Sequence, residues 1–169
     1  TTGRDPRWTC LIATVAEQQL SELIPRFDLR GMDLQLERMR HALQDLGSPC
    51  GEIPAIQVAG TNGKGSIASF LSAALQQAGI RSGVTTSPHL VSWCERIAIN
   101  GVPISEGDLR QLLLAQQQLC AKHQLTPFEQ LIAAALAHFH TEAVEVLVLE
   151  VGLGGRVDAT TAHPRRPVI

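Results

Sequence analysis

The chain has 169 residues, of which 44% are hydrophobic and 18% are charged, and its formal net charge is -2. These values are ordinary for a globular domain with a real core, and they exclude the broad basic field that attracts nucleic acid. No apolar run approaches the roughly 18 residues that a membrane helix needs. We therefore expect neither a nucleic-acid partner nor a membrane span.

The cysteines and the N-terminus bear on the compartment. Cys10, Cys50, Cys94 and Cys120 show no C-x-x-C spacing, so neither a zinc knuckle nor a redox pair is indicated. The N-terminal sequence TTGRDPRW lacks the apolar centre of a signal peptide. We interpret the cysteines as reduced thiols of a cytoplasmic protein.

The first 52 residues are predicted to be a helical segment. A helix over Thr9–Ile24 ends at Pro25, and a second helix over Asp33–Leu46 ends at Gly47. A short strand at 55–59 then begins a region in which strands and helices alternate, which favours an α/β fold.

A glycine-rich stretch, VAGTNGKGS, follows the strand at 55–59, and an amphipathic helix follows the stretch. Apolar residues recur along this helix at helical spacing, which predicts one buried face. That face contains Ile67, Phe70, Leu71, Ala74, Leu75 and Ala78.

The middle of the chain predicts a strand, a hairpin and two helices. The strand at 81–86 is broken at Ser87-Pro88, and Asn100-Gly101 is a strong hairpin turn signal after the alternating residues 95–100. A helix starting near Ser105 carries Leu109, Leu112, Leu113, Leu119 and Cys120 on one side. Another begins at Thr126-Pro127-Phe128-Glu129, which has a cap, a first-turn proline and a capping-box acid in order.

The sequence VEVLVLEV at 144–151 predicts the central strand of the sheet. Its nearly continuous apolar run is typical of a parallel strand covered on both faces, and it runs into the loop GLGGR. Ligands of such sheets bind beyond the carboxyl ends of the strands. The loops after residues 59, 86 and 151 are therefore the candidate site of a mostly parallel sheet flanked by helices.

The stretch VAGTNGKGS departs twice from the strict phosphate-binding pattern G-x-x-x-x-G-K-[ST]. Val58 replaces the first glycine, and Gly65 follows Lys64 and displaces the hydroxyl to Ser66. A position between strand and helix nevertheless favours phosphate binding over a tight turn with a surface lysine. Lys64 is then expected to meet the β- and γ-phosphates, with Ser66 or Thr61 on the metal side.

Other candidate residues have a structural alternative. Glu150 lies inside an apolar strand, where a lone carboxylate is costly, so we favour a Mg²⁺ ligand over an ion pair with Arg156. Turn chemistry explains Ser87 by spacing alone, and a capping box explains Glu129. Asp158 stays open between a turn residue and a ligand contact.

Several motifs together resemble a known family. VAGTNGKGS, TTSPHL, ERIAINGVPIS, TPFEQL and LEVGLGGRVDAT occur in this order, and DLQLERM lies before them. They closely resemble the dihydrofolate synthase/folylpolyglutamate synthase family of Mur-ligase-like ATP-dependent amide ligases. The resemblance runs from about residue 33 to about residue 160. It implies a P-loop-containing, truncated central ATPase domain.

The resemblance also implies the site residues and the cofactors ATP and Mg²⁺. Lys64 and Glu150 are the expected catalytic residues, and Ser87 and Glu150 the expected metal ligands. The expected ATP contacts are Gly60, Thr61, Asn62, Gly63, Lys64, Gly65 and Ser66. The expected pteroate or folate contacts are Asp33, Leu34, Gln35, Leu36, Thr126, Pro127, Phe128, Glu129, Val157, Asp158 and Ala159.

Two departures from the family pattern stand out. The family has Asn after D-A-T, where this chain has Thr161, and the chain stops at Ile169. We interpret residues 1–169 as the N-terminal part of an ATP-binding domain, in which 1–52 lead into a core at 53–169 and the C-terminal glutamate-ligase domain is absent. An incomplete sheet edge is expected.

The resemblance implies a monomer that adds L-glutamate to dihydropteroate or to folyl-glutamates through an acyl phosphate. Two alternatives remain open from the sequence: a Mur-type ligase acting on another carboxylate, and an ATP-binding fragment without turnover.

Overall fold

The structure is a computed structural model that describes residues 20–24, 35–165 and 167. Residues 20–23 are helical, and the rest of the helix expected over Thr9–Ile24 lies outside the described residues. The elements follow in the order α2 (Leu36–Asp45), β1 (Ala55–Val58), α3 (Lys64–Gln77), β2 (Ser82–Thr85), η1 (Trp93–Arg96), β3 (Ile97–Ile99), β4 (Val102–Pro103), α4 (Glu106–Ala115), α5 (Gln117–Lys122), α6 (Pro127–Thr141), β5 (Val146–Glu150) and η2 (Ala159–Ala162). None of the helices within these described ranges is long and apolar enough to cross a membrane.

The strands form one mixed sheet in the order β1-β5-β2-β3-β4. β5 pairs in parallel with β1 and β2, whereas β3 and β4 form an antiparallel hairpin on the edge. The hairpin turn has positive φ at Asn100 (48°) and Gly101 (76°), as a two-residue turn of this kind requires. The α/β fold with a parallel centre is confirmed.

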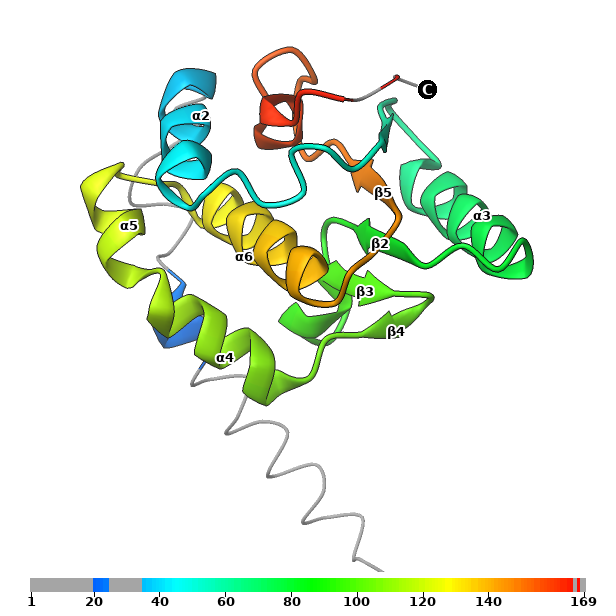
Figure 1. Cartoon of the computed structure of the whole chain (residues 1–169), viewed down its shortest axis with the longest axis horizontal. Helices are drawn as coiled ribbons and strands as arrows, with labels where there is room; N and C mark the ends of the chain where they lie inside the picture. Colours follow the sequence, from blue (N-terminus) through cyan, green and yellow to red (C-terminus); the bar gives the residue numbers. More distant parts are fainter. Residues whose placement is uncertain (1–19, 25–34, 166, 168–169) are drawn as a thin grey trace, which may run out of the picture.

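Strand β5 is covered on both faces, as its apolar run predicts. Leu147 and Leu149 belong to the larger core cluster, whereas Val148 belongs to a smaller one with Val58 and Val84. Side chains alternate between the two faces of a strand, so one short segment supports two cores. Figure 1 shows α3 on one side of the sheet and α6 with α2, α4 and α5 on the other.

Helix α3 packs on the sheet with a different face from the one expected. Ala68 is fully buried against the smaller cluster, and Leu71 and Leu75 pack beside it. Ile67 and Phe70 remain 42% and 70% exposed. The apolar stripe of this helix is wider than the contact with the sheet, and the small side chain of Ala68 lets the helix approach closely. The prediction of a single buried face was therefore wrong for Ile67, Phe70, Ala74 and Ala78, which are exposed.

The helix expected after Ser105 is divided in two. The hydroxyl of Ser105 accepts a hydrogen bond from the backbone N–H of Asp108, which confirms the start of α4. The helical path is interrupted at Gln116, which separates α4 from α5. Cys120 on α5 then packs with Ala42 of α2 and with Leu125. Because the segment is divided, α4 can pack on α6 while α5 packs on α2.

The outer edge of β1 is partly paired. The backbone N–H of Ala55 donates to the carbonyl of Arg165 at 2.8 Å, and that of Gln57 donates to the carbonyl of Pro167 at 2.9 Å. Two outward-facing donors of the expected open edge are thus satisfied by the last described residues.

Candidate functional site

The glycine-rich loop connects β1 to α3. Gly63 is the residue before the helix and has a left-handed φ of 76°, and no side chain caps the helix. The first-turn N–H groups are therefore oriented as in a phosphate site, with the positive end of the helix dipole behind them. The ammonium Nζ of Lys64 donates to the carbonyl of Gly60 across the loop at 3.1 Å.

Glu150 and Ser87 meet at the carboxyl edge of the sheet. Glu150 is 4% exposed, and its Oε2 accepts a 2.9 Å hydrogen bond from the backbone N–H of Ser87. A Cβ placed on Gly65 would lie 3.8 Å from the same oxygen, so the loop, the end of β2 and the end of β5 come together here. Within the described ranges no ion pair joins Glu150 to Arg156, which was the structural alternative for this carboxylate.

The charge of Glu150 is opposed by burial and supported by its neighbours. Burial raises the pKa of the Glu150 carboxyl, and the Ser87 hydrogen bond and the positive charges of Lys64 and Arg96 lower it. Among the described residues, Oε1 of Glu150 and the hydroxyl of Ser87 have no hydrogen-bond partner. Two oxygens of this kind fit a Mg²⁺ ion that keeps several waters. In the described part of the chain, no group of three or more His, Cys, Asp or Glu side chains is arranged so that it could hold a metal ion.

The N-terminus of α6 is built by the predicted capping box. Oε2 of Glu129 accepts hydrogen bonds of 2.7 Å from the backbone N–H and the hydroxyl of Thr126. Arg38 of α2 adds an ion pair at 3.0 Å, and both charged side chains are nearly buried. Glu129 therefore ties α2 to α6. Arg38 was missed by sequence reasoning because it lies 91 residues away along the chain.

The ring of Phe128 packs against the backbone of Gly152, since an added Cβ on Gly152 would lie 2.8 Å from the ring.

Asp158 is 1% exposed, and the loop between Gly152 and Thr160 folds around its carboxylate. Its two oxygens accept hydrogen bonds from the N–H groups of Gly152, Leu153 and Thr160 and from the Thr160 hydroxyl. Both oxygens of the Asp158 carboxylate are thus used in shaping the glycine loop.

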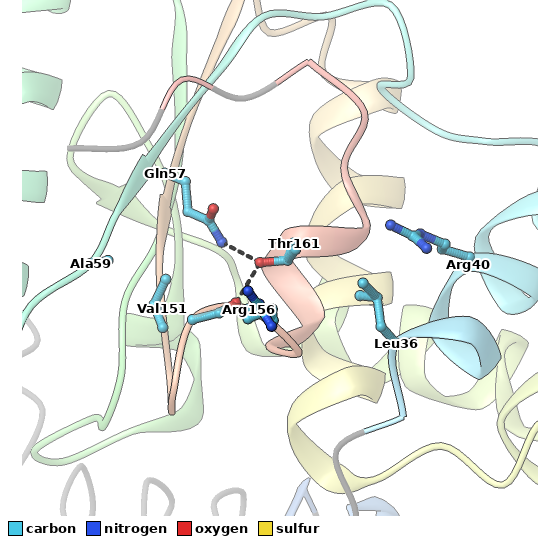
Figure 2. A pocket seen from close by; sticks show the side chains of 8 residues that line it. Leu36, Arg40, Gln57, Ala59, Val151, Arg156 and Thr161 are labelled. Carbon is cyan, nitrogen blue, oxygen red and sulfur yellow. Dashed lines mark hydrogen bonds between the residues drawn. The ribbon is translucent and has the colours of Figure 1, made fainter.

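A cavity of about 450 Å³ opens beside this loop, between α2, β1 and the end of β5. Figure 2 shows Arg156 and Thr161 from the C-terminal segment, and Leu36 and Arg40 from α2, around it. Gln57 of β1 is buried and lines the cavity. Its side-chain amide donates hydrogen bonds to the Thr160 and Thr161 hydroxyls at 2.7 and 2.8 Å, and these bonds connect β1 to the C-terminal segment. The full lining is Leu36, Arg40, Gln57, Ala59, Val151, Gly155, Arg156 and Thr161.

The predicted substrate residues do not all lie together. Leu36 lines the cavity, and exposed Gln35 precedes it at the start of α2. Val157 is 38% exposed, whereas Ala159 is 5% exposed and belongs to the core. Asp33 and Leu34 lie outside the described residues. Gln57 is a polar residue in an otherwise apolar strand, and this was the sequence signal that could have identified it as a residue lining the cavity.

Known proteins resemble this chain strongly in sequence, although no family model matches it. It is 39% identical over 135 residues to dihydrofolate synthetase of Saccharomyces cerevisiae, which covers 79% of this chain and 32% of the relative. It is 42% identical over 142 residues to dihydrofolate synthase/folylpolyglutamate synthase of Mycobacterium tuberculosis, which covers 76% of this chain and 29% of the relative. The chain therefore spans about a third of the length of the curated relatives that it matches.

Solved structures agree with these relatives. E. coli FolC in complex with DHPP and ADP has a TM-score of 0.82 and 34% identity, covering 90% of this chain and 37% of that one. Mycobacterium tuberculosis folylpolyglutamate synthase complexed with ADP has a TM-score of 0.73 and 40% identity, covering 88% and 34%. Over the part of these enzymes that it spans, the chain belongs to the dihydrofolate synthase/folylpolyglutamate synthase family.

Proposed function

We propose that this chain supplies the nucleotide-binding part of an ATP-dependent ligase that adds L-glutamate to dihydropteroate, to folyl-glutamates, or to both. The contact between Ser87 and Glu150 beside the phosphate loop carries this proposal. The buried carboxylate of Glu150 is hydrogen-bonded to Ser87 and lies within the electrostatic influence of Lys64, which supports a role in phosphoryl transfer. ADP is bound in the similar E. coli and Mycobacterium tuberculosis structures, which supports a nucleotide at this loop.

ATP is proposed to bind along residues 60–66. The N–H groups at the start of α3 face its phosphates, and Lys64 compensates the charge on the β- and γ-phosphates. Ser87 and Glu150 are the residues that would hold Mg²⁺, which supplies positive charge to the phosphates when bound.

The reaction begins with the substrate carboxylate. Its oxygen forms a bond to the γ-phosphorus, and the bond from that phosphorus to the bridging oxygen breaks and releases ADP. The acyl phosphate is then attacked by the amino group of glutamate, and inorganic phosphate leaves. The first step moves no proton, so this part of the chain needs only to hold two anions together and to compensate their charge.

The cavity beside the Gly152–Asp158 loop is proposed to receive the folate-side substrate. Leu36 and Val151 give it apolar walls, and Arg40 and Arg156 are cations that suit carboxylates. Of the segments proposed from the family pattern, 33–36 contributes Leu36 to the lining, and 157–159 directly follows Arg156, which also lines the cavity.

Residues 1–52 and 53–169 are proposed to be a helical segment and a nucleotide-binding core of one domain. We also propose that the enzyme is a monomer.

We propose that the enzyme is cytoplasmic, and the cysteines support this. No disulfide joins Cys50, Cys94 and Cys120 in the described part of the chain. Burial raises the pKa of the Cys50 and Cys120 thiols to about 11, which keeps both thiols protonated and unreactive.

The test is an assay of the natural full-length protein with ATP, Mg²⁺, dihydropteroate and glutamate, followed by detection of both ADP and the folate product. ADP and folate should appear in equal amounts, and only when both substrates are present. ADP release without a folate product would contradict the proposal. ATP binding without any release would favour a nucleotide-binding module, and product formation from another carboxylate would favour a different Mur-type ligase.

A further inference from the structure

Arg96 is a buried cation whose side chain is fixed from two sides. It is 8% exposed, and its Nε donates a 2.7 Å hydrogen bond to Nδ1 of His89. Its guanidinium carbon lies 4.8 Å from the ring centroid of Trp93, within the range of a cation–π interaction. These contacts determine both the plane and the direction of the guanidinium, which is unusual for an arginine outside an ion pair.

Backbone pairing places Arg96 beside the proposed metal ligands. The backbone N–H of Thr86 donates to the carbonyl of Arg96 at 3.2 Å, and the next residue, Ser87, donates to Glu150. Along the sheet edge, Lys64 follows β1 and Arg96 precedes β3, with Glu150 and Ser87 at the ends of the two strands between them. The two cations thus flank the carboxylate from opposite sides.

The charges of Arg96 and Glu150 influence one another without forming an ion pair. Burial lowers the pKa of Arg96, Glu150 raises it, and Arg96 in turn lowers the pKa of Glu150. Within the described residues, nevertheless, Arg96 makes no salt bridge, and its only side-chain hydrogen bond is the one from Nε. The terminal nitrogens of Arg96 therefore keep donors that no described residue uses.

The site contains more positive than negative charge. Lys64 and Arg96 are two cations around one carboxylate, and Lys64 donates to a backbone carbonyl instead of to Glu150. Arg96 is buried as a residue, but its terminal nitrogens are not among the buried side-chain atoms without a hydrogen bond, so they reach solvent and are accessible to an incoming anion. The terminal nitrogens of Arg96 have the fork geometry that suits the oxygens of a phosphoryl group.

We propose that Arg96 is a further catalytic residue, whose terminal nitrogens bind the phosphoryl group while it passes from ATP to the substrate carboxylate. This assignment rests on the proposed ligase function. Negative charge is spread over the three equatorial oxygens of that group while one phosphorus–oxygen bond forms and the other breaks. Lys64 compensates the negative charge on the oxygens that face the nucleotide. Arg96 compensates the negative charge on the oxygens that face β2 and β3.

His89 and Trp93 are then positioning residues. The hydrogen bond to Nδ1 of His89 fixes one edge of the guanidinium, and the Trp93 ring covers one of its faces. The contrasting possibility is that Arg96 only holds the loop 87–95 in place. That role would reduce stability and nucleotide binding together, without a selective effect on phosphoryl transfer.

The experiment compares Arg96→Met and Arg96→Lys in the natural full-length protein. Arg81→Met is the matched control, because Arg81 is half-exposed in an ion pair with Glu142 at the opposite end of β2. Four quantities are measured: Tm, kcat, Kd for ADP alone, and Kd for ADP with aluminium fluoride and the folate substrate, a mimic of the planar phosphoryl group.

Arg96→Met should lower kcat at least about 100-fold, in line with other donors to developing charge. It should weaken the aluminium fluoride complex by a similar factor and leave the Kd for ADP within about twofold, since ADP lacks the transferred group. Arg96→Lys should recover part of kcat. Arg81→Met should change neither kcat nor the Kd of the aluminium fluoride complex.

Two outcomes would overturn the assignment of Arg96. One is a kcat within about threefold of the parent in a folded Arg96→Met protein. The other is an equal loss of affinity for ADP alone and for the aluminium fluoride complex, in Arg96→Lys if Arg96→Met does not fold. A parent protein that forms no folate product would contradict the ligase function itself, and with it this assignment.

Discussion

The backbone N–H of Ser87 donates a 2.9 Å hydrogen bond to Oε2 of Glu150, although the two residues are 63 positions apart in the sequence. The contact joins the end of β2 to the end of β5. It leaves Oε1 of Glu150 and the Ser87 hydroxyl without a partner in the described part of the chain. The pair therefore combines a structural bond with two oxygens that remain available to a cation.

Replacing Glu150 by Gln should abolish ligase activity and raise thermal stability. Because burial raises the pKa of this carboxyl, the folded protein binds the proton more tightly than the unfolded chain, so ionisation above the ordinary value of 4.5 weakens folding. Gln keeps an oxygen for the Ser87 N–H and carries no charge. Tm should therefore rise at pH 7.5 without metal, and a fall in Tm would contradict this account.

Gly83 of β2 should tolerate no side chain. A Cβ built there would lie 2.7 Å from the ring of Phe139, which is fully buried on α6. We expect Gly83→Ala to lower the free energy of unfolding by about 1–3 kcal/mol through overpacking.

Gly107→Ala is the matched control for this change, measured by urea denaturation. An added Cβ on Gly107 meets only the Ser105 hydroxyl at 3.8 Å, and the residue lies in the first turn of α4. Alanine there should stabilise by up to about 1 kcal/mol. Equal effects of the two substitutions would contradict the packing of α6 on β2.

The two arginines of α2 should differ sharply. Arg38 pairs with buried Glu129, whereas Arg40 pairs with Glu37 on the surface, where the two side chains are 44% and 70% exposed. Arg38→Met leaves a buried carboxylate without its cation and should lower the free energy of unfolding by about 3 kcal/mol. Arg40→Met should change it by at most about 0.5 kcal/mol. Similar losses in the two variants would show that the Arg38 pair is not a desolvated one.

His138 should make folding weaker in acid. Burial lowers the pKa of this imidazole, so below the ordinary value of 6.5 the unfolded chain takes up the proton before the folded protein does. The stability associated with the neutral ring is complete above pH 6.5 and is lost as the pH falls. His138→Gln should flatten the dependence of Tm on pH between 5 and 7. Parallel Tm curves for the two proteins would contradict this prediction.

Much of the fold could be predicted because its signals are local. The caps at Ser105 and Thr126 act within three residues of themselves, and the turn at Asn100-Gly101 needs only positive φ at two neighbours. The apolar run of β5 likewise predicted a strand buried on both faces. The buried face of α3 was predicted less well, since Phe70 is exposed. Periodicity shows how wide an apolar stripe is, but it does not show which part of the stripe a neighbouring element covers.

The sequence by itself determined the order of the elements and the three loops of the candidate site, since these depend on residues adjacent in the chain. Only the tertiary structure decided which side chains meet there. Arg38 with Glu129, Gln57 with Thr160 and Thr161, and Arg96 with His89 beside Glu150 depend on how helices and strands pack. The sign and amount of charge around Glu150 follow from that packing, because burial and distance set the strength of each electrostatic interaction.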